Sequence, residues 1–387
     1  MPENLTPSYE MIATRSGLEH LSQALQNEKV VAVDLEADSM YHFKEKVCLL
    51  QMATESVTFV IDPLQIQDLS ALKPFFKNRD IQKVFHGADY DIRSLFRDFQ
   101  ITINNLFDTQ LACRFLGIEE TSLEAVLNKW YNVTLNKKYQ RKDWSERPLP
   151  AEMVAYAAED VRYLAALAQR LESDLKSKGR LLWVYEECDH LSRVRPVAND
   201  TDPLFLHFKG AGKLDPRSLA VLEALLKYRK NIAQKKDKPL FKVIRNKSLM
   251  QLSVAKPHKL LYLEKTKALS PKQISMYGKD IVSTIQAAVK LPANALPVYP
   301  RKKASHVPPE IGMRVKALRR WRNQQAKELK IDPALISTNA QINTIAVQNP
   351  HNLVSLAKIK EIKKWQKRTF GNDIIEVLGK AGRQRMF

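Results

Sequence analysis

The sequence has no long hydrophobic run, and we expect no N-terminal targeting segment. None of its apolar stretches reaches the roughly 18–20 residues that a helix needs to cross a bilayer. The first residues contain neither a basic segment nor an apolar segment of the kind that forms a signal peptide. We therefore expect a cytoplasmic protein that makes no contact with a membrane.

Cysteine is also scarce. The three cysteines, Cys48, Cys113 and Cys188, lie in apolar or helical contexts, and their spacing is not that of metal ligands. We expect buried, reduced thiols, which excludes a disulfide-stabilised scaffold and a structural zinc site.

Acidic residues are sparse in the second half of the chain. The 387 residues carry a net charge of +20. Residues 1–200 hold 24 Lys and Arg against 30 Asp and Glu, a net charge of −6, and residues 201–387 hold 38 against 12, a net charge of +26. Because such a length predicts two or three domains, we interpret the chain as an acidic catalytic or regulatory unit followed by a region that binds a polyanion.

The front half alternates strands with helices. Residues 30–36, 47–53, 57–61 and 83–86 are rich in β-branched and apolar residues, and the second and third of these runs form a predicted antiparallel hairpin. Helices are predicted over about 17–28, 68–77, 109–116, 151–175 and 180–194. We expect an α/β domain with a mixed sheet over residues 1–195, followed by all-α domains.

The back half contains an internal repeat with a shift of 93 residues. Pro257-His258 recurs as Pro350-His351, and Tyr277-Gly278 corresponds to Phe370-Gly371. A single ungapped shift that aligns proline, glycine and aromatic positions indicates duplication of one folding unit. We predict two tandem helical domains, over residues 205–290 and 308–387.

Two acidic residues end the first strand of the front half. Asp34 and Glu36 are two positions apart, so their side chains point to the same face of the strand. Two adjacent carboxylates repel each other, and a divalent cation would offset that repulsion. An isolated Asp-x-Glu is more often a solvated pair in a turn, so the remaining acids decide between the two interpretations.

Further acids occur after the other predicted core elements. Asp91 lies just inside a helix that follows the strand ending at His86, and Asp89 competes with it because it lies two residues earlier. Tyr156 and Asp160 are four apart and share one face of a helix, with Glu159 as the competitor of Asp160.

Other residues are weaker candidates. The basic loop 132–149 contains Lys138, Arg141 and Trp144, which could contact a nucleic-acid strand or be ordinary solvated residues. His86 could contact a substrate or pack in its turn. Asp108 follows a short strand and could support the site from behind, whereas Gln51, in the middle of a strand, is interpreted as structural.

Taken together, these motifs resemble a known family. Asp34-x-Glu36, the segment from His86 to Asp91, and Tyr156-x-x-x-Asp160 resemble the three exonuclease motifs of the DEDD superfamily in its tyrosine subtype. Their order and spacing are similar to those of the ribonuclease D family and its relative in the nuclear exosome. The helical repeats resemble HRDC domains. The resemblance implies a ribonuclease H-like catalytic domain, and it selects Asp91 over Asp89 and Asp160 over Glu159.

The resemblance also implies a mechanism. Asp34, Glu36, Asp91 and Asp160 would hold two divalent cations, Mg²⁺ or Mn²⁺, with Asp34 shared between them. Tyr156 would orient the attacking water. Asp89 would then cap its helix. His86, Lys138, Arg141 and Trp144 are the substrate-binding candidates.

The implied activity is hydrolysis of RNA from its 3′ end, with release of nucleoside 5′-monophosphates. The implied partners are transfer RNA precursors and other small structured RNAs, with no obligate protein partner. Two alternatives remain open: a DNA 3′→5′ exonuclease of the same fold, and an RNA-binding scaffold without catalytic activity. The four acids argue against the scaffold, because binding alone does not need them.

Overall fold

The computed structural model describes residues 9–196, 202–300 and 308–383. These residues form two compact units, which we describe separately. The first comprises residues up to 37, 47–196 and the region from 306 onwards, and the second comprises residues 38–46 and 197–305. Residues 1–8, on which the expectation about targeting rests, and the last four residues of the third predicted domain lie outside the described residues.

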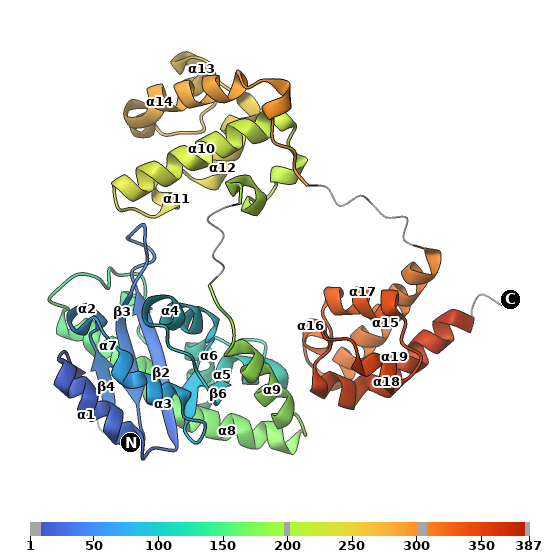
Figure 1. Ribbon diagram of the computed structural model, residues 1–387. Coiled ribbons are helices and arrows are strands. Elements are labelled where there is room, and N and C mark those ends of the chain that lie inside the picture. The colour runs from blue at the N-terminus through green and yellow to red at the C-terminus, as the bar shows by residue number, and fades with distance from the viewer. Residues whose placement is uncertain (1–8, 197–201, 301–307, 384–387) are drawn as a thin grey trace. The chain divides into compact units, whose positions relative to one another are not determined.

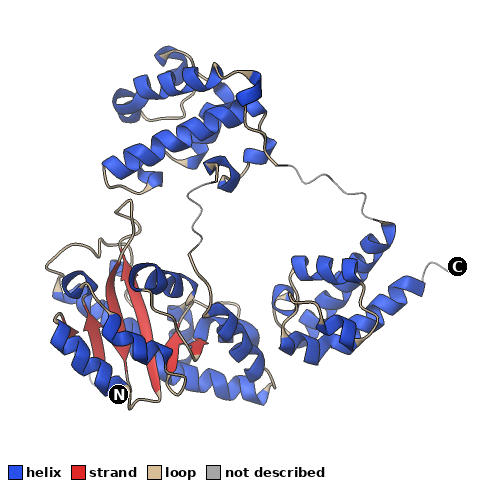
Figure 2. Cartoon of the chain, in the orientation of Figure 1, coloured by secondary structure: helices blue, strands red, loops and turns tan. Residues whose placement is uncertain are grey.

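A six-stranded sheet forms the centre of the first unit (Figure 2). The sheet is mixed, as predicted. The strand order is β1-β4-β3-β2-β5-β6. β3 is antiparallel to β2 and to β4, whereas β1–β4, β2–β5 and β5–β6 are parallel pairs. The strands are β1 (Tyr9–Ile12), β2 (Val30–Ala37), β3 (Val47–Ala53), β4 (Thr58–Ile61), β5 (Gln82–Phe85) and β6 (Leu106–Asp108).

Helices enclose the sheet (Figure 1). Every residue of β3 is buried, so both faces of the sheet are covered at its centre. This explains why the strand is apolar at every position except Gln51, rather than alternating apolar and polar residues. The helices of this domain are α1 (Arg15–Leu25), α2 (Pro63–Ile66), α3 (Lys73–Lys77), α4 (Asp89–Phe99), α5 (Thr109–Leu116), α6 (Leu123–Tyr131), α7 (Ala151–Arg162), α8 (Leu164–Ser177) and α9 (Leu181–Leu191).

Two expectations about these elements are corrected. The helix predicted over 151–175 is broken at Tyr163 into α7 and α8, because α7 packs on β2, β3 and β4 whereas α8 packs mainly on α5. Strand β1 was not predicted, because its four residues include only one that is buried, Ile12. Among the described residues, no helix has both the length and the apolar character that crossing a bilayer requires.

The second unit contains the first helical repeat. Its helices are α10 (Pro216–Lys235), α11 (Leu240–Val243), α12 (Asn246–Ala255), α13 (Leu260–Lys265) and α14 (Pro271–Val289). α10 packs against α12 and α14, and a separate apolar core lies between them. The second repeat has the same series of elements: α15 (Pro309–Leu329), α16 (Pro333–Ile336), α17 (Asn339–Gln348), α18 (Leu353–Ala357) and α19 (Lys364–Arg383).

The shift of 93 residues holds at the level of single contacts. α11 and α12 superpose on α16 and α17 in sequence without a gap. Arg229 donates to the carbonyl of Ile244 at 3.0 Å and to the side chain of Asn246, and Arg322 donates to the corresponding pair. An arginine that donates to these two groups is therefore part of the duplicated unit, although only Arg229 is buried and Arg322 is half-buried.

The second repeat packs against α9 of the α/β domain. The ring of Trp365 stacks on that of Trp183 with 4.6 Å between centroids, and its Nε1 donates to Glu187 at 2.9 Å. Lys363 forms an ion pair with the same carboxylate. The carboxylate of Glu186 accepts the backbone N–H of Trp365 at 2.9 Å. Because α19 begins at residue 364, Glu186 caps this helix from outside the repeat.

Candidate active site

Strand β2 positions the first two acids. Asp34 lies opposite Gln51 of β3, and Glu36 lies opposite Leu49. Leu35 between them is buried, whereas the two acids are half-buried, which is the alternation expected of a strand. A register irregularity follows Glu36. The strand therefore presents both carboxylates on one face just before its regular pairing ends.

Helix α7 brings the second pair of functional groups to that face. Ala157 and Ala158 are buried and pack with Leu49, so the helix lies close to the sheet. The hydroxyl of Tyr156 donates a hydrogen bond to Asp160. The small side chains permit this close approach, and the four-residue spacing then places Tyr156 and Asp160 together over β2.

The first turn of α4 supplies the remaining acid, and the structure distinguishes the two candidates. Asp91 is buried, whereas Asp89 is exposed and forms an ion pair with Arg93 at 2.7 Å. The charge of Asp89 is thus already compensated. The prediction that Asp89 caps the helix is wrong, because the N-cap position is Ala88 and no side chain caps it.

The turn before α4 is held by Asp108. Its carboxylate accepts the backbone N–H of Gly87 at 3.0 Å and of Ala88 at 2.9 Å, and it also caps α5. Gly87 has φ of 81°, a left-handed conformation that favours glycine. Asp108 therefore fixes the backbone from which Asp91 projects.

The four carboxyl groups of the site interact. Burial raises the pKa of Asp34 to about 6 and that of Asp160 to about 7, and in Asp160 the charge of Asp34 adds to the effect. The pKa of Glu36 is raised by burial and then by the charges of Asp34, Asp160 and Asp91. Burial and the charge of Asp34 also raise the pKa of Asp91. The mutual effects show that the acids of three separate elements gather at one place.

This donor set fits a divalent cation. No Lys or Arg contributes to the shifted pKa of any of the four carboxyls, so no cation among the described residues balances them. Oxygen ligands of this kind are those that Mg²⁺ and Mn²⁺ prefer. Within the described ranges, no three acidic, histidine or cysteine side chains are already positioned as a metal-ligand group. The carboxylates would therefore have to draw together around the ion.

Tyr156 remains protonated at neutral pH. Burial raises its pKa, and the charges of Asp160, Glu36 and Asp34 add to that effect. The group can therefore donate a hydrogen bond but not act as a base. Glu159, the competitor of Asp160, forms an ion pair with Arg162 at 3.7 Å, and its charge is the smallest of the effects that shift the pKa of Asp160.

The four residues predicted to contact the substrate differ in how far they are exposed and in the partners that they have. Trp144 is only 1% exposed and packs with Tyr156 at 6.1 Å between ring centroids, so the prediction of a direct substrate contact is corrected to a packing role. Both ring nitrogens of His86 are engaged, with Thr109 and with the carbonyl of Thr121, each at 2.9 Å. Lys138 and Arg141 are exposed on the loop.

Gln51 is a polar residue of the site that sequence reasoning took as structural. It is fully buried, it is the register partner of Asp34, and neither of its amide atoms has a hydrogen-bond partner among the described residues. A buried amide without a partner is unusual. The sequence feature that could have pointed to this residue is a glutamine in the middle of an otherwise apolar strand.

Comparison with known proteins agrees with this geometry. The 3′–5′ exonuclease family profile matches residues 9–176, and the HRDC domain profile matches residues 218–285 and 312–378. RRP6-like 1 of Arabidopsis thaliana is 30% identical over 355 residues, which are 88% of this chain and 53% of that protein. The chain spans between 30% and 53% of the first three curated relatives that it matches.

Solved structures extend the comparison. The catalytic core of RRP6 from Trypanosoma brucei is 31% identical, with a TM-score of 0.64 that covers 76% of this chain and 82% of that one. Ribonuclease D of Escherichia coli, an exoribonuclease involved in structured RNA processing, is 26% identical, with a TM-score of 0.71 over 96% of this chain and 99% of that one.

The fold and the gathered acids define a 3′–5′ exonuclease domain, to which two HRDC domains are joined. The chain belongs to the family of exonucleases that contains ribonuclease D and the RRP6 proteins. The resemblance inferred from the motifs and the predicted fold class are confirmed.

Proposed function

We propose that the protein is a metal-dependent 3′→5′ exoribonuclease that releases nucleoside 5′-monophosphates. The observation that supports this proposal best is the convergence of Asp34, Glu36, Asp91 and Asp160 on one buried place beside Tyr156. Buried acids that raise one another's pKa are costly for a binding module, whereas a phosphodiesterase that uses divalent cations requires them.

The four carboxylates would hold two divalent cations. When bound, these ions would activate a water molecule and neutralise the charge that develops on the phosphate and on the departing 3′ oxygen. The charge of Asp34 raises the pKa of each of the other three acids, Glu36, Asp91 and Asp160. This shared interaction supports the assignment of Asp34 as the ligand common to both ions. The Tyr156 hydroxyl would orient the attacking water, and Asp108 would hold α4 so that Asp91 keeps its position.

The proposed substrates are the 3′ tails of transfer RNA precursors and other small structured RNAs. Lys138 and Arg141 are the remaining candidates for contacts with the strand that enters the site. Human exosome complex component 10, a relative with 32% identity over 66% of this chain, is by its name part of an assembly. The expectation that this chain needs no obligate protein partner therefore stays a prediction.

The decisive experiment compares wild-type protein and the Asp34→Asn variant on matched RNA and DNA oligonucleotides with a free 3′ tail. We expect stepwise shortening of the RNA from its 3′ end with Mg²⁺, no reaction with a chelator, and no reaction of the variant. Preferential shortening of the DNA would support the DNA exonuclease instead. Binding of RNA without any shortening at several Mg²⁺ and Mn²⁺ concentrations would support the scaffold.

A further inference from the structure

Gln51 is the polar residue of β3, and its register partners define where its side chain lies. It pairs with Asp34 of β2 on one side and with Val60 of β4 on the other. Because directly opposite residues of antiparallel strands point to the same face, the side chain of Gln51 lies between those of Asp34 and Val60. The amide of Gln51 therefore shares a face of the sheet with a candidate metal ligand.

Helix α7, which carries Asp160, covers this face. It packs on β2, β3 and β4. Its Ala157 shares a buried core with Leu49 and Val60, which point to the same side as Gln51. Gln51 itself is fully buried, so bulk solvent does not reach its amide. A partner for the amide must therefore come from the groups enclosed beneath this helix.

The amide of Gln51 is unpaired in the metal-free protein. Neither its nitrogen nor its oxygen has a hydrogen-bond partner among the described residues. A buried donor or acceptor that makes no hydrogen bond lowers stability, because it loses its bonds to water and gains none in return. An apolar side chain of similar size would avoid this loss, so the metal-free fold alone does not account for a glutamine at this position.

Two other buried glutamines provide an internal comparison. The Nε2 of Gln341 donates to the carbonyl of Glu361 at 2.7 Å and to the side chain of Gln366 at 3.0 Å. Gln366 in turn donates to the carbonyl of Ile336 at 2.8 Å. These amides connect elements of the second repeat, which is the usual structural role of a buried amide. Gln51 makes no such connection within the part of the chain that the structure describes.

The buried charges near the other strands are compensated, in contrast to that of Asp34. Asp62, which follows β4, pairs with Arg147 at 2.7 Å, and the Nζ of Lys83 in β5 donates to the carbonyl of Ile81 at 2.7 Å. For Asp34, burial raises the pKa and a backbone hydrogen bond at Leu35 opposes that effect. A further donor would favour the ionised carboxylate, which is the form that binds a cation.

We propose that Gln51 is a positioning residue of the metal site, and that its amide N–H donates to the carboxylate of Asp34 when that carboxylate binds a divalent cation. Groups that donate to a metal ligand commonly fix its orientation and increase its affinity for the ion. The acids have to draw together around an ion, so this contact forms in the same adjustment. The unpaired amide of the metal-free protein is then a cost that metal binding offsets. The inference rests on the proposed function, because it takes Asp34 as a ligand.

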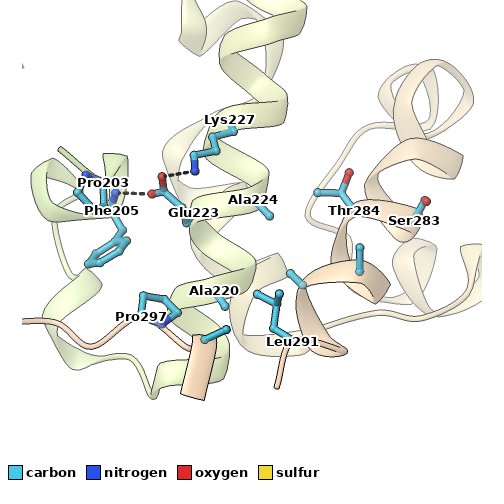
Figure 3. A pocket seen from close by; sticks show the side chains of 13 residues that line it. Pro203, Phe205, Ala220, Glu223, Ala224, Lys227, Ser283, Thr284, Leu291 and Pro297 are labelled. Atoms are coloured by element: carbon cyan, nitrogen blue, oxygen red, sulfur yellow. Dashed lines mark hydrogen bonds and ion pairs between the residues drawn. The ribbon is translucent and has the colours of Figure 1, made fainter. Parts of the chain in front are cut away.

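The cavity between α10 and α14, of about 670 Å³, shows the opposite situation (Figure 3). Its lining is mostly apolar. Lys227 pairs there with Glu223 at 3.3 Å, and Glu223 also accepts the backbone N–H of Phe205 at 3.0 Å (Figure 3). The charged groups of this lining already compensate each other, so we assign no ligand to it.

The test measures the affinity of the full chain for Mn²⁺ alone by isothermal titration calorimetry, and the Tm of the same proteins in chelator. Gln51→Met removes the amide and keeps a side chain of similar size. We expect its affinity for Mn²⁺ to fall by about tenfold or more. We expect its Tm in chelator to rise by about 2–4 °C, because an unpaired buried amide has been removed. Gln341→Met is the matched control, since it removes an amide whose hydrogen bonds are made. Its Tm should fall and its affinity for Mn²⁺ should not change.

An unchanged Mn²⁺ affinity of Gln51→Met, or an equal loss of affinity in both variants, would overturn the proposal. A lower Tm of Gln51→Met in chelator would also overturn it, because the amide would then already stabilise the metal-free fold. Asp34→Asn is titrated in parallel. If this variant binds Mn²⁺ as tightly as the wild type, Asp34 is not a ligand, and both the proposed metal site and the role of Gln51 fail. If Asp34→Asn loses the ion while Gln51→Met keeps it, only the role of Gln51 fails.

Discussion

The carboxylate of Asp108 accepts the backbone N–H of Ala88 at 2.9 Å, and through this contact a short strand fixes the turn that precedes α4. The same carboxylate accepts the N–H groups of Gly87 and of the first turn of α5. One buried side chain thus orients two helix starts. Because Asp91 projects from the first of them, the position of a candidate ligand depends on a residue that need not touch the metal.

We predict that Asp108→Asn lowers both stability and activity. Asparagine keeps one carbonyl oxygen but turns its amide toward N–H groups that need an acceptor, which should cost about 1–3 kcal/mol. Denaturant unfolding and the rate of RNA shortening would measure the two effects. Asp89→Asn is the control, since Asp89 is exposed and forms an ion pair with Arg93. Equal effects of both substitutions would contradict the anchoring role.

Asp34→Asn should abolish cleavage while it stabilises the metal-free protein. We expect at least about a 10³-fold loss of rate, because an ion's stabilisation of the transition state is worth several kcal/mol. At pH 7 the variant removes a carboxylate whose ionisation is disfavoured by burial. Thermal unfolding in chelator would show a higher Tm for the variant. A lower Tm would mean that Asp34 is compensated in a way that the structure does not show.

The pH dependence of stability should follow the raised pKa values. Burial lifts the pKa of Asp34 to about 6 and of Asp160 to about 7, above their unfolded values near 4. The folded protein then holds more protons than the unfolded chain between these values, so this contribution to stability decreases as pH rises from about 4 to about 7. Urea unfolding in chelator at pH 5 and pH 7.5 would measure a loss of order 2 kcal/mol, and added Mg²⁺ should restore it. The decrease in the free energy of unfolding between these two pH values should be smaller in Asp34→Asn.

Tyr156→Phe should lower kcat by about 10- to 100-fold and leave RNA binding unchanged. The hydroxyl stays protonated and orients water, so its removal should cost less than the roughly 10²–10⁴-fold typical of a general acid or base. Single-turnover rates across pH 6–9 would test this assignment. We expect the rate of the variant to be lower by the same factor at every pH. A rate that falls only on one limb of the pH–rate profile would identify Tyr156 as the titrating group.

Gly117→Ala should loosen the second repeat. A Cβ at Gly117 would lie 2.0 Å from the backbone oxygen of Lys330, and φ there is 81°. Gly179→Ala is a matched control, because its φ of 67° causes similar strain but no atom lies within 4 Å of the added carbon. We expect a destabilisation of more than about 1 kcal/mol at Gly117 beyond that of the control. Limited proteolysis should release the second repeat faster in Gly117→Ala alone.

The sequence by itself predicted the mixed sheet, the duplicated helical region and the candidate acids. The spacing of apolar residues was enough to assign segments as strands or helices, because this spacing shows which face of a segment is buried. The shift of 93 residues predicted a duplicated helical unit, and the structure shows that the helices of the two repeats follow the same shift. The spacing of Tyr156 and Asp160 was enough to place them on one face.

Tertiary structure decided what depends on neighbours from distant segments. Asp89 and Asp91 differ little in sequence, and only packing buries Asp91 and leaves Asp89 to Arg93. Trp144 lies in a basic loop, yet the fold places its indole in a core, because large aromatic groups gain most from leaving water. The packing of the second repeat on α9 likewise arises from three-dimensional contacts, since local sequence does not specify which surface a distant helix will cover.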